Sequence, residues 1–106
     1  MNANGWIEEE YYPWVRMNVP ISYMKSDHMH PPKSICQYLP PSTVKTLLRC
    51  QGKEWNVTLT GVVQRRLVKG WKQFVVDNNL KKGSVLLFEL VEATSSAVIF
   101  VVEVLG

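Results

Sequence analysis

Apolar and polar positions alternate along much of the chain with the period of two residues that is typical of β-strands. The alternation first holds over Trp14–Val19, and Pro20 ends it because proline cannot donate a hydrogen bond to a strand ladder. It returns over Val44–Arg49 and Trp55–Thr60, two runs that flank a short loop containing Gly52. A short glycine-bearing loop between two alternating runs predicts a β-hairpin.

Three further segments are predicted to be extended. Gly61–Lys69 is apolar at both ends and is interrupted by Gln64-Arg65-Arg66, whose side chains we expect to project from the edge of the strand. Val85–Val91 and Ala97–Val104 follow as the last two strands. Because these two runs are apolar on both faces, we expect them to be buried on both sides.

Two short helices are predicted where the apolar spacing changes to three and four residues. The first begins at Pro31-Pro32 and ends at Pro40-Pro41, because proline suits the first turn of a helix and stops its continuation. The second begins after Gly70 and ends at Asp77–Asn79. Between the first strand and the first helix, Ser22–His30 is polar and irregular, which predicts a loop that ends in a short strand.

The length of 106 residues allows one domain, and a hydrophobic content of 46% excludes a chain that is disordered throughout. Six or seven strands and two short helices predict a mainly β fold, a small barrel or pseudobarrel, since closing a sheet removes its exposed edges. We assign residues 1–10 to a flexible acidic tail and residues 11–106 to the folded domain. No apolar run approaches the roughly 20 residues of a membrane-spanning helix, so we expect no membrane partner.

The basic side chains are concentrated in one part of the chain. The net charge is +3, but residues 16–72 carry ten Lys and Arg side chains against two acidic ones. The segments before and after this stretch are net acidic. A basic segment of this size is typical of proteins that bind polyanions, and the alternative is a set of solubility charges spread over the surface.

Catalytic and metal chemistry are disfavoured by the residue spacing. Ser26-Asp27-His28 holds the residue types of a catalytic triad, but neighbours along a chain rarely face one another as nucleophile and base must. The candidate zinc ligands lack the paired spacing of a finger or ribbon; they are His28, His30, Cys36 and Cys50. We therefore expect no enzyme, no metal, no cofactor and no small-molecule substrate. The N-terminus is unlike a secretory signal and two cysteines make no disulfide framework, so we expect an intracellular protein.

Four segments of the chain carry a recognisable set of motifs. Gly70–Gly83 holds a Gly-Trp pair, a Phe-Val pair three residues on, a leucine and a glycine turn, and the other segments are His30–Ile35, Gly52–Val57 and Phe88–Leu90. In their order and spacing these segments resemble the plant-specific B3 DNA-binding domain family, and the likeness covers about residues 14–104. The run Asp77–Leu80 is most similar to the reproductive-meristem branch.

The resemblance implies a seven-stranded open pseudobarrel that grips the major groove of double-stranded DNA with two arms. Such a domain would be the DNA-recognition part of a plant transcription regulator in the nucleus. The arms correspond to about Ser22–His30 and Val63–Lys72, and both lie in the basic segment. The candidate DNA contacts are Gln64, Arg65, Arg66, Lys69 and Lys72 in the second arm and Ser22, Lys25, Ser26 and His28 in the first.

Each candidate has a chemical role that follows from its side chain. Arginine can read guanine through two hydrogen bonds and glutamine can read adenine, whereas lysine and serine typically hold phosphates. Backbone amides at the start of the second helix, beside Lys69 and Lys72, are predicted to favour a phosphate as well. The aromatic side chains are predicted to lie in the core; they are Trp14, Trp55, Trp71, Phe74, Phe88 and Phe100.

Two alternatives stay open at this point. Since fold does not fix function, the chain could be a non-catalytic protein-interaction module on the same fold with weak or lost DNA binding. Ser22–His28 matches the family pattern only loosely, and Ser84 stands where the family usually has aspartate. The other alternative is a bacterial-type DNA-recognition domain attached to a nuclease, for which the chain offers no cluster of nuclease carboxylates.

Overall fold

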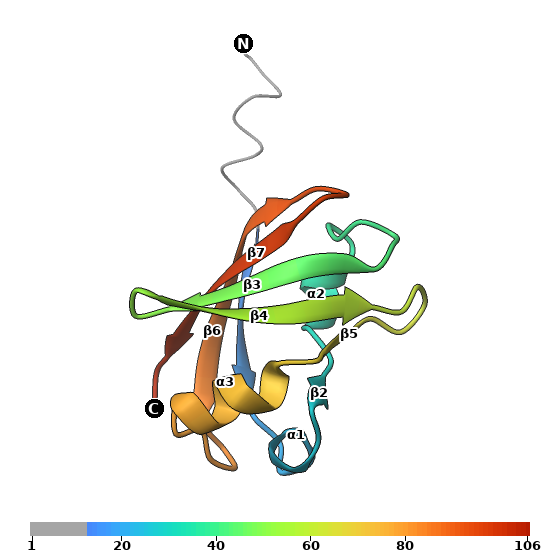
Figure 1. The fold of residues 1–106 in the computed structure, drawn as a ribbon. Helices are drawn as coiled ribbons and strands as arrows, with labels where there is room; N and C mark the ends of the chain where they lie inside the picture. Colours follow the sequence, from blue (N-terminus) through green and yellow to red (C-terminus); the bar gives the residue numbers. More distant parts are fainter. Residues whose placement is uncertain (1–12) are drawn as a thin grey trace.

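Seven strands form one curled sheet that closes partway into a half-barrel (Figure 1). The computed structural model describes residues 13–106, so the predicted acidic tail at residues 1–10 lies outside the described residues. The sheet order is β1-β6-β7-β3-β4-β5-β2, with β3 and β7 parallel and all other neighbours antiparallel. The predicted mainly β, seven-stranded open pseudobarrel is confirmed. The strands are β1 (Trp14–Asn18), β2 (His28–Met29), β3 (Val44–Cys50), β4 (Lys53–Thr60), β5 (Arg66–Val68), β6 (Val85–Ala93) and β7 (Val98–Val104).

Residues 13–106 contain three short helices, one more than predicted: α1 (Ser22–Lys25), α2 (Lys33–Cys36) and α3 (Trp71–Asp77). α2 and α3 lie where the sequence places them. The prediction of a loop over Ser22–His30 is wrong at α1, which is a single helical turn. In this turn Tyr23 N–H donates to the Pro20 carbonyl and Met24 N–H donates to the Ile21 carbonyl, both at 3.0 Å. One turn is too short to show helical periodicity. The short strand expected at the end of this segment is confirmed as β2. None of the three helices is long and apolar enough to cross a membrane.

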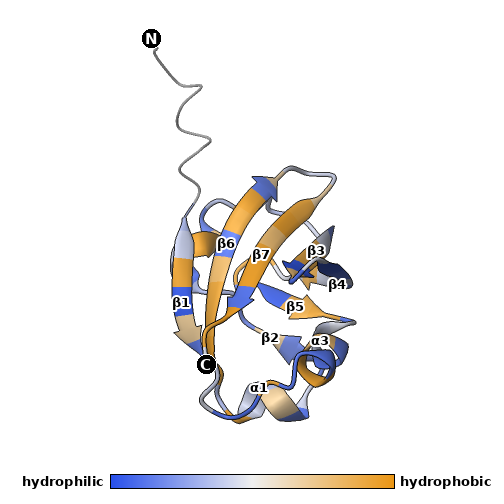
Figure 2. Cartoon of the chain, turned by 90° about the vertical axis from the view of Figure 1, so that its left-hand side faces the viewer, coloured by the Kyte–Doolittle hydropathy of each residue, from blue (hydrophilic) through white to orange (hydrophobic). Residues whose placement is uncertain are grey.

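The core lies on the inner face of the sheet, and strand alternation selects its residues. Phe88 on β6 and Phe100 on β7 are fully buried, with ring centroids 5.6 Å apart in an edge-on arrangement. The expectation that both strands are buried on both sides is wrong, because Val91 and Val101 on their outer faces are exposed. Figure 2 shows why the pattern misleads, since β6 and β7 are coloured as hydrophobic along much of their length. Because β6 and β7 lie inside the sheet, their backbone groups form hydrogen bonds with a strand on either side. The outer face of the two strands is nevertheless left uncovered.

α3 completes the core against β4 and β2. Its buried residues include Trp71 and Phe74, whose rings stack with centroids 5.5 Å apart, and Trp55 of β4 meets Phe74 edge-on at 5.1 Å. The predicted core position is wrong for Trp14, which is 64% exposed. Trp14 pairs with Glu89 across the ladder between β1 and β6, so both side chains lie in an outward-facing row.

Candidate nucleic-acid interface

The outer side of the four strands β3, β4, β5 and β2 carries a row of polar side chains. The register pairs Lys45 with Thr58, Thr58 with Val68, and Val68 with His28. Residues directly opposite each other lie on the same face of a sheet, so this row crosses all four strands. Within the strands, the residues beside this row are buried, which directs the row outward; they are Val44, Thr46, Val57, Leu59, Leu67 and Met29. We define the outer strand face by these residues and the outward residues beside them: His28, Lys45, Asn56, Thr58, Thr60, Arg66 and Val68.

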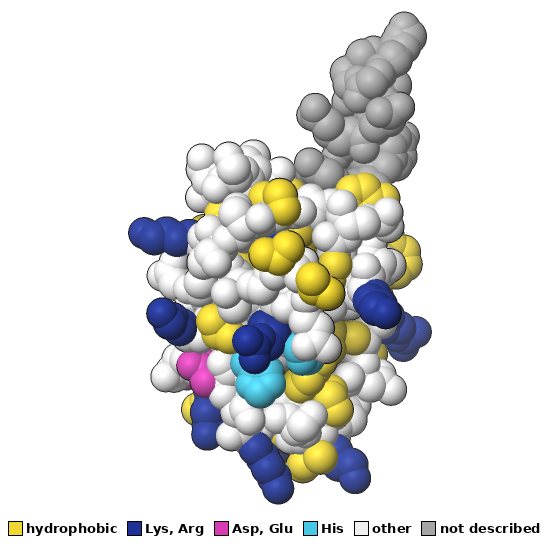
Figure 3. Space-filling view, turned by 90° about the vertical axis from the view of Figure 1, so that its right-hand side faces the viewer, with side chains coloured by type: hydrophobic (Ala, Val, Ile, Leu, Met, Phe, Trp, Pro, Cys, Tyr) yellow, Lys and Arg dark blue, Asp and Glu magenta, His cyan; other side chains and the backbone are white. Residues whose placement is uncertain are grey.

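This face is basic. Arg66 and Lys45 are exposed on it, and Lys69 follows β5 at one side. A groove of about 290 Å³ is lined by Lys45, Asn56, Val57, Thr58 and Lys69. Figure 3 views the molecule from the side where β2 and β5 lie and shows both histidines with Lys and Arg side chains around them and little acidic surface. Glu54 lies at the far end of β4, where its carboxylate accepts a 2.8 Å hydrogen bond from Arg49.

Lys45, Asn56, Thr58 and Thr60 were not among the residues that the sequence marks as candidates. Each lies in a run that reads as an ordinary alternating strand, with polar residues at the solvent phase. The pairing of β4 with β5, in which Thr60 lies opposite Arg66, is what brings them beside the second predicted arm. Which strands pair depends on segments that lie apart in the sequence. The alternation within one strand therefore could not predict this pairing.

The two predicted arms are joined by Asp27. Its carboxylate accepts hydrogen bonds from the backbone N–H groups of Gly70, at 3.2 and 3.3 Å, and of Lys72, at 2.8 Å. For these two amides the expectation that they are open to a phosphate is therefore wrong, because a side chain from the first arm already occupies them. The indole N–H of Trp71 donates to the Tyr23 carbonyl at 2.9 Å and adds a second link.

Gly70 is required at this junction. Its φ of +146° is unfavourable for other residues, and a Cβ here would lie 2.1 Å from the carbonyl oxygen of Asn56. The start of α3 thus lies directly against β4. Lys69 and Lys72 hold exposed side chains on either side of this fixed point.

Arg65 and Arg66 face opposite ways. Arg66 is the first residue of β5 and is exposed on the outer strand face, whereas the Arg65 side chain is only 8% exposed. The Arg65 guanidinium donates to the carbonyls of Pro40 at 2.7 Å and Ser42 at 2.9 Å. The expectation that Arg65 projects is therefore wrong. Successive side chains of a strand alternate in direction, so only one of two adjacent arginines can point outward.

Arg65 instead fastens the loop between β4 and β5 to the rest of the domain. Besides its two side-chain bonds, its carbonyl oxygen accepts a 3.1 Å hydrogen bond from Nδ1 of His30. Its Nε is buried and has no hydrogen-bond partner among the described residues. Gln64, the remaining member of the predicted trio, is exposed as expected.

The first arm places its candidates on two elements. Ser22 and Lys25 are exposed on α1, which contacts α3. Ser26 and His28 are half-buried, and His28 lies in β2 with its ring edge-on to that of His30 at 5.9 Å. His28 thereby joins the outer strand face, and the two serines and Lys25 lie in the segment that leads to it.

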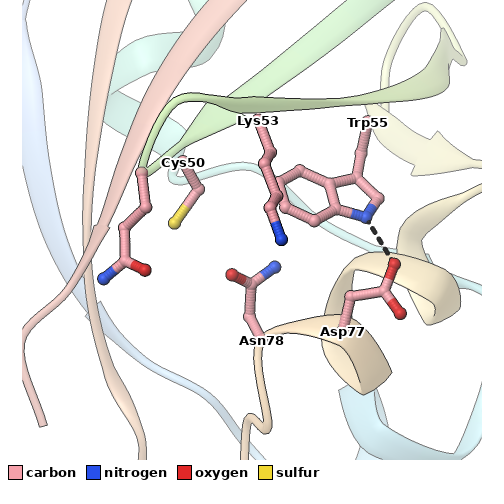
Figure 4. A pocket seen from close by; sticks show the side chains of 6 residues that line it. Cys50, Lys53, Trp55, Asp77 and Asn78 are labelled. Carbon is pink, nitrogen blue, oxygen red and sulfur yellow. Dashed lines mark hydrogen bonds between the residues drawn. The ribbon is translucent and has the colours of Figure 1, made fainter.

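A second hollow lies at the opposite end of β4, beside the hairpin between β3 and β4 (Figure 4). It measures about 410 Å³ and is lined by Cys50, Gln51, Lys53, Trp55, Asp77 and Asn78. Asp77 accepts 2.8 Å hydrogen bonds from the indole of Trp55 and the amide of Gln73, and these bonds lower the pKa of its carboxyl. Burial, with a smaller contribution from Glu103, raises the pKa of the Cys50 thiol. Across residues 13–106, no cluster of three His, Cys, Asp or Glu side chains could hold a metal ion.

The match to a family model and the curated relatives agree on one family. Residues 14–103 match the model of the B3 DNA binding domain. The chain is 34% identical over 89 residues to the B3 domain-containing protein At3g06220 of Arabidopsis thaliana, covering 81% of this chain and 48% of that protein. The chain spans less than half the length of the curated relatives that it matches.

Among the solved structures with a similar fold are two from Arabidopsis. That of the Arabidopsis thaliana protein At1g16640.1 aligns with a TM-score of 0.61 at 26% identity, over 86% of this chain and 91% of that one. The Arabidopsis FUS3–DNA complex aligns with a TM-score of 0.62 at 13% identity, over 85% of this chain and 93% of that one. An identity as low as that of the second shows a shared fold alone.

Proposed function

This chain belongs to the B3 DNA-binding domain family, and from that premise we propose that it binds double-stranded DNA through the major groove with a preference for sequence. It acts, without catalysis, as the DNA-recognition domain of a plant transcription regulator in the nucleus. The observation that carries the proposal is the outer strand face, which is basic and continuous across β3, β4, β5 and β2. One structure of the same fold, FUS3, was solved as a complex with DNA.

The end of the hairpin of β4 and β5 has the shape for this task. The ladder to β3 ends at Leu59 and the ladder to β2 ends at Leu67, so the segment from Thr60 to Arg66 extends beyond both neighbouring strands. A two-stranded β-ribbon fits into the major groove, which is about 12 Å wide. Arg66 and Gln64 are exposed near the tip of this ribbon, so we assign base contacts to them, with arginine suited to guanine and glutamine to adenine. Lys69 and Lys72 flank the start of α3 and hold phosphates beside the ribbon, and Lys45 adds a third ammonium group on β3.

The first arm contributes a second line of contacts. Lys25 and Ser22 reach the backbone from α1, and Ser26 and His28 do so from the approach to β2. The bonds of Asp27 to the start of α3 keep this arm at a fixed position relative to the second one. Arg65 serves the interface as a positioning residue, because it holds the ribbon tip in place from beneath.

The finer placement within the family rests on the sequence of the α3 terminus. The run Asp77–Leu80 supports membership of the reproductive-meristem branch. Asp77 itself bonds Trp55 and Gln73, so it contributes to the scaffold rather than to the DNA contacts.

Selection from a random duplex pool, followed by fluorescence anisotropy at two salt concentrations, tests the proposal. Binding should weaken with salt, since log K falls by about 0.9 for each log unit of salt per phosphate neutralised. Arg66→Ala should weaken binding and relax the base preference. Lys82→Ala is the matched control, because Lys82 is exposed in the turn between α3 and β6, where Gly83 and Ser84 bond Val19 next to the half of the sheet that holds β1 and β6.

Two results would contradict the proposal. If no duplex binds at low salt, the protein-interaction module on this fold becomes the better account. If Arg66→Ala binds as tightly and as selectively as Lys82→Ala, DNA binding lies on another face.

A further inference from the structure

The tip of the loop between β4 and β5 presents two apolar side chains to solvent. Val62 is 73% exposed and Val63 is 97% exposed, the highest values for large hydrophobic residues in the part of the chain that the structure describes. Residues this exposed bury almost no surface when the domain folds, so they contribute little to its stability. The two valine side chains are thus available for an apolar contact with a molecule outside the domain.

The loop that carries the two valines is held in one shape. Gly61 has a φ of +85°, and a Cβ at this position would lie 2.0 Å from the carbonyl oxygen of Gln64. The turn is therefore too tight for any residue but glycine. At its other end the loop is fastened through the side chain and the carbonyl of Arg65. A loop that is already ordered loses less conformational entropy when its tip binds a ligand.

The position of the loop tip indicates which chemical groups of a bound duplex it contacts. Thr60 and Arg66 are paired across the ribbon, so the valines lie at its end, just beyond the basic outer strand face. A ribbon that enters the major groove presents its tip to the edges of the bases. The C5-methyl group of thymine is the apolar feature of that groove.

Resting on the proposed function, we propose that Val62 and Val63 read thymine through contact with its C5-methyl group. Arg66 lies beside the tip, and Lys33 lines a pocket together with Val63 and Gln64. These two cations favour nucleic acid over an apolar protein surface as the occupant. Gln64, exposed beside the valines, offers hydrogen bonds to an adjacent base pair. The loop would then combine apolar and polar recognition in three consecutive side chains.

Replacing thymine by deoxyuridine in the selected duplex removes the methyl group and leaves every hydrogen-bonding group in place. Each thymine of the site is replaced singly, and affinities are measured by anisotropy. At the contacted position we expect binding to weaken about fourfold, the value for one methyl group withdrawn from water. In a Val62→Ser, Val63→Ser double variant, which removes the methyl groups of both side chains and adds polar hydroxyls, the same replacement should have no effect.

Val91→Ser is the matched control, because Val91 is also exposed but lies on β6, on the outer face of the other half of the sheet. It should keep the fourfold sensitivity to deoxyuridine. Equal unfolding midpoints for the three proteins would show that differences in binding do not come from folding.

The outcomes separate this inference from the proposed function. If a duplex binds but the site holds no thymine, or every deoxyuridine replacement leaves the affinity unchanged, the inference is overturned and the proposed function stands. The inference also fails if the double variant retains the full sensitivity to deoxyuridine. If no duplex binds at all, the proposed function fails and this inference fails with it.

Discussion

Arg65 and Arg66 are neighbours in sequence, and we expect their substitution to have opposite consequences. Replacing either by methionine keeps an unbranched apolar stem and removes the guanidinium. In Arg65→Met this deletes the hydrogen bonds to the carbonyls of Pro40 and Ser42 within a side chain that is 8% exposed. In Arg66→Met the deleted group is exposed, so the folded state loses little.

The magnitude follows from the bonds that are lost. A hydrogen bond from a charged donor contributes about 1.5–3 kcal/mol, so two give roughly 3–6 kcal/mol. Against this, Nε of Arg65 is buried without a partner among the described residues, and removing it regains about 1–3 kcal/mol. We therefore expect Arg65→Met to lose about 2–3 kcal/mol of unfolding free energy, a fall in Tm of roughly 10 °C or more. Arg66→Met should stay within about 0.5 kcal/mol.

Two assays read the two effects. Urea unfolding followed by tryptophan fluorescence measures stability, since Trp71 is fully buried in the core. Duplex affinity for the selected site and for single-base variants of it measures the base contacts. Arg66→Met should weaken binding and relax the base preference, whereas Arg65→Met, measured well below its Tm, should keep the base preference of the parent. Equal stabilities for the two variants, or an unchanged base preference for Arg66→Met together with a relaxed one for Arg65→Met, would refute the assignment.

The remaining predictions concern the start of α3, the acid range and the core. Asp27→Asn replaces the charged acceptor of the α3 amides, so urea unfolding should show a loss of about 1 kcal/mol, and an unchanged value would contradict the bridging role. Because hydrogen bonds from Trp55 and then Gln73 lower the pKa of Asp77, its contribution to stability is complete above the ordinary value of 3.8 and is lost as the pH falls through the lowered pKa. Asp77→Asn should therefore flatten the acid part of a stability–pH curve, and parallel curves would argue against this. Phe100→Ala removes a fully buried ring and should cost about 3–5 kcal/mol in the same titration, with a cost below 1 kcal/mol excluding its core position.

Local rules accounted for most of the secondary structure. Proline placed the start of α2, and the glycine-bearing loop placed the hairpin of β3 and β4. Ser84 stands where the family usually has aspartate. It still stabilises the turn, because its hydroxyl accepts a 2.8 Å hydrogen bond from the Lys81 amide. These features depend on residues a few positions apart, so they can be read from the chain.

The site was predictable in outline and not in its details. The basic segment and the two arms were located from charge and from the family resemblance. Which side chain faces outward was not, because it depends on where β5 begins, and a shift of one residue exchanges Arg65 with Arg66. The role of Asp27 could not be foreseen either, since its hydrogen-bond partners at Gly70 and Lys72 lie 43 and 45 residues further along the chain.

The sequence by itself determined the strands, two of the three helices, the family and the concentration of positive charge in residues 16–72. The tertiary structure decided which of these charges act together. It set Lys45 in the same row as His28 through two intervening strands, buried Arg65 and left Val63 exposed at the tip of a rigid loop. The physical reason is that alternation and turn chemistry act over a few residues, whereas strand register and hydrogen bonds between distant segments are fixed when the whole sheet forms.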